Sequence, residues 1–339
     1  MRSWKVLLAA TVACGLAVAA PQHESAAQTP VKIRLAWVVP VANWASILPE
    51  KADLLQHQGK SYVLEPVRFQ GTPPMISAMA INDLEIGNLA YSSFSLAVEN
   101  ANLSDLRIIA DEFQDGVPGY YSDEFFVAKD SPIKTVEDLK GKVLATNAVG
   151  SAVDIAMRAM LRKHKMQDKR DVTIIEGAFP NMPAMLSDHK VDLFPGVLPF
   201  SANPKIREVT RTLFTQEQAV GTTQMIVWAA RAGFIQKNRA ALVDFMEDML
   251  RAERWFLSPA NHKEAVAIAA KVSKLPEGVF DSWLFTHKDY YRDPNGKPNL
   301  AALQANVDLQ KQLDLLKTSF DVKKYADLSI VEDAAKRLK

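Results

Sequence analysis

The sequence predicts an α/β protein made of two doubly wound lobes joined by two crossings of the chain. Three observations predict this class. Segments typical of strands alternate with segments typical of helices over two consecutive blocks. A turn-rich stretch at 115–121 (DGVPGYY) separates the blocks. From about Gly221 a strand followed by long helices indicates that the chain crosses back.

The first block has the rhythm of strand, loop and helix. Its expected strands are 31–37, 62–69, 84–89 and 106–110. A helix should begin with Thr72 as N-cap and Pro73 as its first residue, with Met75 and Met79 on one face. A second helix should follow the third strand and run through Val98.

The second block repeats the rhythm, and the return crossing adds helices. Its expected strands are 124–128, 143–146, 172–176 and 191–194. Helices are expected after Gly150 and Ser151 and again over 181–186. After the crossing a strand is expected at 224–229. Two apolar stripes then indicate helices: Val243, Met246, Met249, Leu250 and Phe256, and later Leu303, Val307, Leu313 and Leu316.

The first 27 residues predict export. Arg2 and Lys5 form a basic start, an apolar run covers 6–20, and small residues precede Gln28. This order is typical of a secretory signal peptide over 1–27. The alternative, an uncleaved anchor, is disfavoured because a membrane span needs about 20 apolar residues.

Cys14 is the only cysteine, and it lies inside the apolar run. Cleavage after Ala27 leaves a chain that can form no disulfide, zinc–thiolate site or thiol nucleophile. Lipidation of Cys14 stays open, although the preceding residues make a poor lipid-attachment motif. We therefore expect a periplasmic protein without metal or cofactor.

Length and charge narrow the class further. The 339-residue chain has a net charge of +1, and removing Arg2, Lys5 and Glu24 brings it to zero. A nucleic-acid partner would need a basic face, so none is expected. The length after the signal peptide suits two lobes with well-buried cores.

Several segments together resemble the periplasmic solute-binding proteins of ABC importers. The run 126–134 (FVAKDSPIK) followed by 135–142 (TVEDLKGK) is similar to a signature block of these proteins, and the loop 70–73 and the segment 83–93 fit their first lobe. The chain looks closest to the nitrate, sulfonate, taurine and thiamine-precursor group. The resemblance implies a type II binding-protein fold, with one lobe over 28–120 and 223–339 and the other over 121–222. It also implies a monomer that captures a small solute and delivers it to an ABC permease.

The ligand should lie in the cleft between the lobes, beyond the carboxyl ends of the strands. Loops at those ends and at the crossings supply the candidate ligand-binding residues. These are Trp37, Trp44, Gly71, Thr72, Tyr91, Ser92, Ser93, Tyr121, Asn147, Ser151, Asn181 and Thr222. Each polar candidate could instead serve only as a helix cap. Trp44 could be an ordinary core residue, and Tyr121 could only stiffen the crossing.

Two features indicate the ligand class. Helices that start at Thr72, Ser93 and Ser151 would present free N–H groups to an anion. The aromatic candidates could stack on a flat or apolar part. The second lobe reads FPGVLPF at 194–200, without the acid that the family often carries there, which disfavours a basic ligand. A small organic anion is therefore expected, of the sulfonate or aromatic carboxylate type.

Enzyme functions find little support in the sequence. The histidines have no metal-ligand spacing, and there is no nucleophile elbow or P-loop. The expected function is solute binding for an ABC importer. The alternative is a periplasmic sensor that presents its bound form to a membrane receptor.

Overall fold

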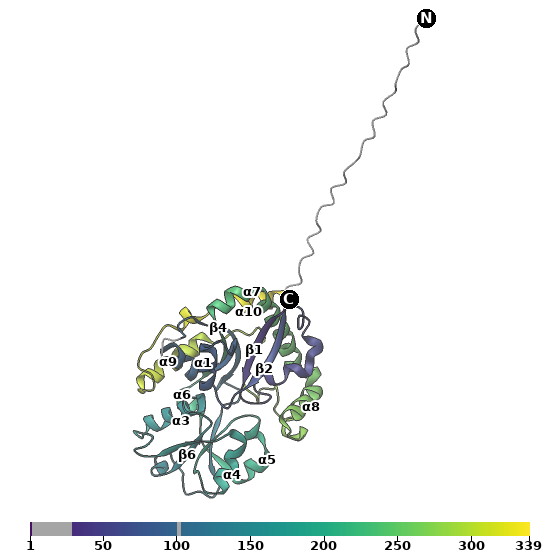
Figure 1. Cartoon of the computed structure of the whole chain (residues 1–339). Coiled ribbons are helices and arrows are strands. Elements are labelled where there is room, and N and C mark those ends of the chain that lie inside the picture. The colour runs from purple at the N-terminus through teal and green to yellow at the C-terminus, as the bar shows by residue number, and fades with distance from the viewer. Residues whose placement is uncertain (2–28, 100–102) are drawn as a thin grey trace.

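The computed structural model describes Met1 and residues 29–99 and 103–339. These residues form two parts, each with its own β-sheets and helices. In Figure 1 the teal middle of the chain forms the lower part, and the purple and yellow-green segments form the upper part. The predicted two-lobed α/β fold is confirmed. The predicted signal peptide from Arg2 onward, Cys14 included, lies outside the described residues. Within those residues, no helix has the length and apolar character needed to cross a membrane.

The upper part contains a five-stranded sheet. Its strands in spatial order are β2 (Tyr62–Arg68), β1 (Val31–Trp37), β3 (Ile86–Ala90), β10 (Thr223–Arg231) and β4 (Leu106–Asp115). β1 is parallel to β2 and β3, whereas β10 is antiparallel to β3 and β4. The sequence predicts a strand at each of these places. However, β4 runs past Ala110 to Asp115, because its acidic residues are buried and hydrogen-bonded.

Six helices of the described residues accompany this sheet. They are α1 (Pro73–Ala80), α2 (Tyr91–Glu99), α7 (Ala232–Leu257), α8 (His262–Ser273), α9 (Leu300–Gln312) and α10 (Ser329–Arg337). The predicted stripe on α7 is confirmed, since all five of its residues are buried. The second stripe is wrong at its end. Asp314 adopts a left-handed φ of 55° just after α9, so Leu313 and Leu316 lie beyond the helix.

The lower part contains two smaller sheets. One is antiparallel, in the order β8 (Phe194–Gly196), β5 (Glu124–Ala128) and β9 (Thr210–Thr215), and the other pairs β6 (Val143–Thr146) in parallel with β7 (Thr173–Glu176). The Ala145 N–H donates to the Leu193 carbonyl at 2.8 Å and links the two sheets.

Helices α3 (Ala152–Lys163) and α4 (Met182–Ser187) of the lower part lie where the sequence predicts them. The elements α5 (Pro204–Val209), β9 and α6 (Gln216–Val220) were not predicted. They are short, and β9 is an edge strand that pairs only with β5, so its sequence carries a weak strand pattern.

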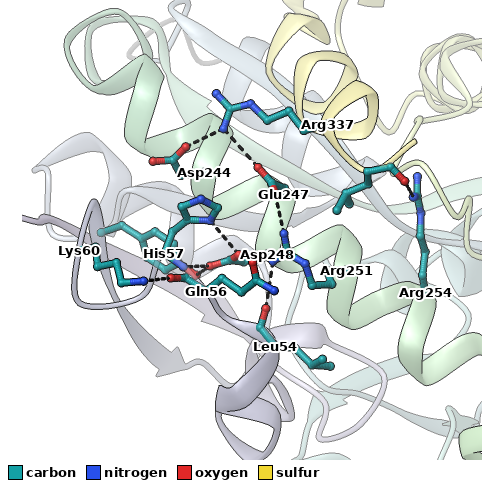
Figure 2. A network of polar contacts seen from close by, with 12 residues as sticks. Leu54, Gln56, His57, Lys60, Asp244, Glu247, Asp248, Arg251, Arg254 and Arg337 are labelled. Atoms are coloured by element: carbon teal, nitrogen blue, oxygen red, sulfur yellow. Dashed lines mark hydrogen bonds and ion pairs between the residues drawn. The ribbon is translucent and has the colours of Figure 1, made fainter.

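Buried polar contacts fasten the long helix α7 to the segment before β2 (Figure 2). The fully buried Asp248 carboxylate accepts the His57 backbone N–H at 2.7 Å and the Tyr62 hydroxyl at 2.9 Å. It also contacts His57 Nδ1 at 2.9 Å and Arg251 Nη1 at 2.5 Å. Arg337 on α10 pairs with two further carboxylates of α7. The last helices are thereby tied to the first strands.

Replacing Asp248 by alanine should strongly destabilise the protein, because it leaves the buried Tyr62 hydroxyl and the His57 N–H without their acceptor. It also removes one of the two carboxylates that Arg251 contacts. We expect Asp248→Ala to lower the free energy of unfolding by about 3–5 kcal/mol, measured by urea denaturation. The control is Glu65→Ala, which removes an exposed ion pair with Lys32 and should change that free energy by less than about 1 kcal/mol. Equal effects of the two variants would contradict the structural role of Asp248.

Candidate functional site

A cavity of about 50 Å³ lies where the two parts of the molecule meet. The upper part contributes residues that follow β1, precede α1, lie on β3, β4 and β10, or come from the loop before α9. These are Val38, Val39, Ala42, Asn43, Thr72, Asn88, Ala90, Phe113, Met225, Ile226 and Tyr290. The lower part and the crossing into it contribute Asp123, Asn147, Ser151, Ala152, Val153, Phe179, Val197 and Leu198. Most of the wall is apolar, with a few polar groups from both parts.

Three of the predicted site residues line this cavity. Ser151 is the N-cap of α3: its hydroxyl accepts the Asp154 N–H at 3.4 Å and donates to Asn147 Oδ1 at 2.7 Å. Thr72 precedes α1 and shares a 2.5 Å hydrogen bond with Ser93. Both side chains therefore cap or brace a helix start and also face the cavity.

Four other predicted residues join the two parts instead of lining the cavity. The Ser92 hydroxyl donates to the Gly150 carbonyl at 2.9 Å, and Ser93 reaches the same carbonyl at 3.4 Å. The Tyr91 hydroxyl donates to the Ala152 carbonyl at 3.1 Å. These bonds connect the start of α2 with the start of α3.

Gly71 makes this close approach possible. A Cβ atom at this position would lie 2.7 Å from the Ala148 Cβ, which is closer than packed carbons approach. Beside it, Gln70 Nε2 donates to the Asn147 carbonyl and Asn147 Nδ2 donates to the Gln70 carbonyl, both at 3.2 Å. The two loops are thus in direct contact at the edge of the cavity.

The remaining five predicted residues do not line the cavity. Trp37 is half-buried below the Arg68 guanidinium, and Trp44 is fully buried against Phe285. Asn181 is exposed at the start of α4. Tyr121 and Thr222 belong to the crossings. The Tyr121 hydroxyl is hydrogen-bonded to Ser201 Oγ at 2.7 Å, and the Thr222 hydroxyl donates to the Gly116 carbonyl at 2.9 Å. The aromatic rings that do line the cavity are Phe113, Phe179 and Tyr290.

A buried polar cluster that the sequence analysis missed supports the loop after β1. Asn43 Oδ1 accepts the N–H groups of Val38 and Val39 at 3.0 and 2.8 Å. Asn43 Nδ2 donates to Glu112 Oε2 at 3.0 Å, and Asn88 Nδ2 donates to the same oxygen. Burial raises the pKa of Glu112 to about 8, although these hydrogen bonds favour its ionised form.

A second missed group lies at the crossing into the lower part. The fully buried Asp123 lines the cavity, and its Oδ1 accepts the Tyr290 hydroxyl at 2.5 Å. Its backbone N–H donates to Asp115 Oδ2 at 2.7 Å. Burial, and then the neighbouring Asp115, raise the pKa of Asp123 well above its usual range, and burial raises that of Asp115 to about 7. The only sequence signal was an acid placed just after the turn-rich stretch.

Helix α3 begins at the wall of the cavity. Ala152 and Val153 are the first two residues of α3 and line the cavity, so their N–H groups have no carbonyl partner within the helix. The prediction of free N–H donors at the start of α1 is wrong for its first two residues, because Pro73 and Pro74 carry no N–H. Among the described residues, no group of His, Cys, Asp and Glu is arranged to hold a metal ion.

The comparison with known proteins gives a family match over most of the chain. A model of the NMT1-like family matches residues 26–270. A protein of Escherichia coli (strain K12), provisionally named an aliphatic sulfonates-binding protein, is 23% identical over 277 residues, which cover 82% of this chain and 83% of that protein.

Solved structures share the fold over nearly the whole length. The alkanesulfonate-binding protein SsuA from Xanthomonas axonopodis pv. citri, bound to MOPS, has a TM-score of 0.69 at 19% identity, covering 88% of this chain and 99% of that one. The periplasmic nitrate-binding protein NrtA from Synechocystis PCC 6803 has a TM-score of 0.70 at 14% identity, covering 91% and 89%. The desulfurization enzyme DSZB has a TM-score of 0.62 at 15% identity, covering 91% and 100%.

The buried carboxyls of β4 predict an unusual dependence of stability on pH. Burial raises the pKa of Asp111 to about 7, as it raises those of Glu112 and Asp115 to about 8 and about 7. The unfolded chain releases these protons near about pH 4, so between these values the folded state holds more protons. The free energy of unfolding should therefore fall as the pH rises from about 5 to about 8.

Urea denaturation across that pH range measures the slope. Glu112→Gln removes one of the titrating groups, so its free energy of unfolding should change less with pH than that of the parent protein. A stability that rises steadily toward pH 8 in the parent protein would show that these carboxyls are ionised in the folded state.

Proposed function

Because the chain belongs to the NMT1-like family, we propose that it is a periplasmic solute-binding protein that captures a small organic anion and delivers it to an ABC permease. In this proposal residues 28–120 and 223–339 form one lobe and residues 121–222 form the other. The lobes close over the ligand about the two crossings. The similarity to binding proteins for alkanesulfonate and nitrate supports this class of function.

The observation that carries the proposal is the cavity at the junction of the two parts. Its polar groups come from both sides: Thr72 and Asn43 belong to the upper part, and Ser151 and the first N–H groups of α3 belong to the lower part. A ligand that contacts both sides stabilises the state in which they are together. This is the arrangement expected of a protein that captures a solute by closing on it.

The free N–H groups of α3 support an anionic head group. Two adjacent backbone donors at the positive end of a helix dipole bind anions without a basic side chain. None of the described residues that line the cavity is Lys, Arg or His. The apolar wall formed by Val38, Val197 and Leu198 would then contact the organic part. The small volume favours a short-chain sulfonate or carboxylate over an aromatic acid.

Two other functions remain as alternatives. A periplasmic sensor would use the same cavity and differ only in its membrane partner. The second alternative is an enzyme, because the desulfurization enzyme DSZB shares the fold. The described residues that line the cavity contain no cysteine, serine–histidine pair or metal cluster, so solute binding stays the better-supported function.

A thermal-shift panel of small acids tests the proposal. A ligand present at 100 times its dissociation constant should stabilise the purified protein by about 2.7 kcal/mol, a measurable rise in Tm. Recovery of the bound acid unchanged would support solute binding. Conversion of the acid would indicate an enzyme, and no Tm shift across sulfonates and carboxylates would contradict the anionic ligand.

A substitution at the start of α3 tests where the anion binds. Ala152→Pro removes one free N–H while keeping the helix start, because Ser151 before it is already extended (φ −71°, ψ 168°). We expect affinity for the best acid to fall at least about tenfold, equivalent to about 1.4 kcal/mol, in isothermal titration calorimetry. Ala152→Gly keeps the N–H and is the matched control. Equal affinities of the two variants would show that the anion does not bind at α3.

A further inference from the structure

We propose that the protein has a second ligand site, an aromatic pocket beside the first crossing that binds a fused-ring aromatic carboxylate. The pocket has a volume of about 730 Å³ and is lined by the end of α7, the start of α8, the segment 285–294 and Tyr120 of the crossing. Among the described residues, it shares only Tyr290 with the cavity between the two parts. The ligand would act there as an effector and not as the solute that the cavity captures.

Aromatic rings form much of the wall of this pocket. Tyr120 and Tyr291 meet edge to face with ring centroids 5.1 Å apart, and the rings of Phe256 and Phe285 lie 5.6 Å apart. A flat ring gains free energy by stacking on such groups or packing against their edges. The volume lies within the range of about 300–1,000 Å³ that is typical of small-molecule sites. A fused ring therefore fits the aromatic pocket, whereas the cavity of about 50 Å³ is too small for it.

Arg292 supplies a donor for the acidic group of the ligand. It is 5% exposed and lines the pocket, and its Nε has no hydrogen-bond partner among the described residues. Its other two nitrogens are engaged, because Nη1 contacts Asp289 Oδ2 at 3.2 Å and Nη2 donates to the Ala42 carbonyl at 3.3 Å. A buried donor without an acceptor is costly, and a carboxylate oxygen in the pocket would supply that acceptor.

The ionisable groups around the pocket favour an anion. The described residues that line it include no Asp or Glu, and His262 and His287 lie in its wall beside Arg292. Asp281, which is 3.6 Å from His262 Nε2, is exposed to solvent. Three acids of β4 and α7 interact with Arg292, but burial raises the pKa of each and favours its neutral form. These acids are Asp111, Glu112 and Glu253.

The wall of the pocket is fixed before any ligand arrives. Phe285 has a left-handed φ of 55°, which is rare for an aromatic residue. Its N–H donates to Asp289 Oδ2 at 2.9 Å, and its ring stacks on Trp44 with centroids 5.5 Å apart. Such a backbone conformation persists only where the surroundings impose it, and it is frequent at ligand sites. A preorganised wall binds a rigid ring with little loss of conformational entropy.

Tyr290 connects the aromatic pocket with the cavity between the two parts. Its hydroxyl donates to Asp123 Oδ1 at 2.5 Å and accepts the Leu198 N–H at 3.2 Å, and both of these residues line the cavity. A ligand that packs against Tyr120 and Tyr290 would stabilise this arrangement of the crossing. This effect rests on the proposed function, since it means that the effector strengthens the binding of a small acid in the cavity.

Calorimetric titration with naphthoate tests the site on the unmodified protein. Naphthamide has the same fused ring without the charge, and cyclohexanecarboxylate has the acid without an aromatic ring. We expect naphthoate to bind at least about tenfold more tightly than either compound, equivalent to about 1.4 kcal/mol.

A substitution that fills the pocket tests where naphthoate binds. Ser258 lines the pocket just after α7 and has an extended backbone (φ −74°, ψ 124°), so Ser258→Phe adds a ring to the wall without straining the chain. We expect this variant to bind naphthoate at least about tenfold more weakly than the parent protein. Ser258→Ala keeps the space and is the matched control. Ala152→Pro, which alters the cavity, should bind naphthoate like the parent protein.

The effect on the cavity is measured by titrating the best small acid with and without saturating naphthoate. We expect naphthoate to lower the dissociation constant of that acid at least about fivefold in the parent protein. In Ser258→Phe it should leave that constant unchanged.

The outcomes separate this inference from the proposed function. Naphthamide that binds as tightly as naphthoate would overturn the acidic ligand. Unchanged naphthoate binding in Ser258→Phe, or its loss in Ala152→Pro, would overturn the assignment to the aromatic pocket. A small acid whose affinity does not respond to naphthoate would overturn the effector role. If no small acid binds while naphthoate binds as expected, the proposed function fails and the second site stands.

Discussion

The position of β10 between β3 and β4 in the larger sheet is the constraint on which the rest of the molecule depends. β10 pairs with β3 on one side and with β4 on the other, so the chain that returns from the lower part completes the sheet that the first residues began. Thr223, its first residue, pairs with Asp115, the last residue of β4. The two crossings therefore start side by side, and both parts of the molecule share one narrow junction.

This junction explains why so many acids are buried there. Asp111 accepts Gln224 Nε2 of β10 at 2.5 Å, and the fully buried Asp115 accepts the Ser122 hydroxyl and the Asp123 N–H at 2.7 Å each. These carboxyls hold the strands and the crossing in register through directed hydrogen bonds. Apolar residues could also be buried here, but they would not fix the direction of the crossing. Burial of the acids in turn raises their pKa values.

The sequence predicted the elements whose pattern is local. The strand at Val31–Trp37, the N-cap at Ser151 and the buried face of α7 each follow from the pattern of residues inside one element. The predicted strand ended at Ala110, five residues before the end of β4, because the sequence that follows, DEFQD, is typical of a solvated segment. Nothing in those five residues shows that Gln224 and Asn43 supply the donors that allow their burial.

The candidate site was predicted only where it depends on local signals. Thr72, Asn147 and Ser151 lie in loops that follow a strand and precede a helix. Ligands of open α/β sheets bind beyond the carboxyl ends of the strands, so this rule selects these three residues, and they line the cavity. Asp123 and Tyr290 are 167 residues apart, and no pattern in the sequence pairs them. Trp44 is an aromatic residue close to a strand end, yet its ring packs against Phe285 and Arg292, which come from much later in the chain.

The start of α3 joins the chemistry of the cavity to the contact between the two parts. The Ala152 carbonyl accepts the Tyr91 hydroxyl from α2, while Ala152 also lines the cavity. Gly150, two residues earlier, accepts the Ser92 hydroxyl through its carbonyl. A ligand that binds these N–H groups therefore binds a helix start that the upper part already holds in place. In the proposed function the same short segment would serve both contacts, so occupancy of the cavity would be thermodynamically coupled to closure of the two parts.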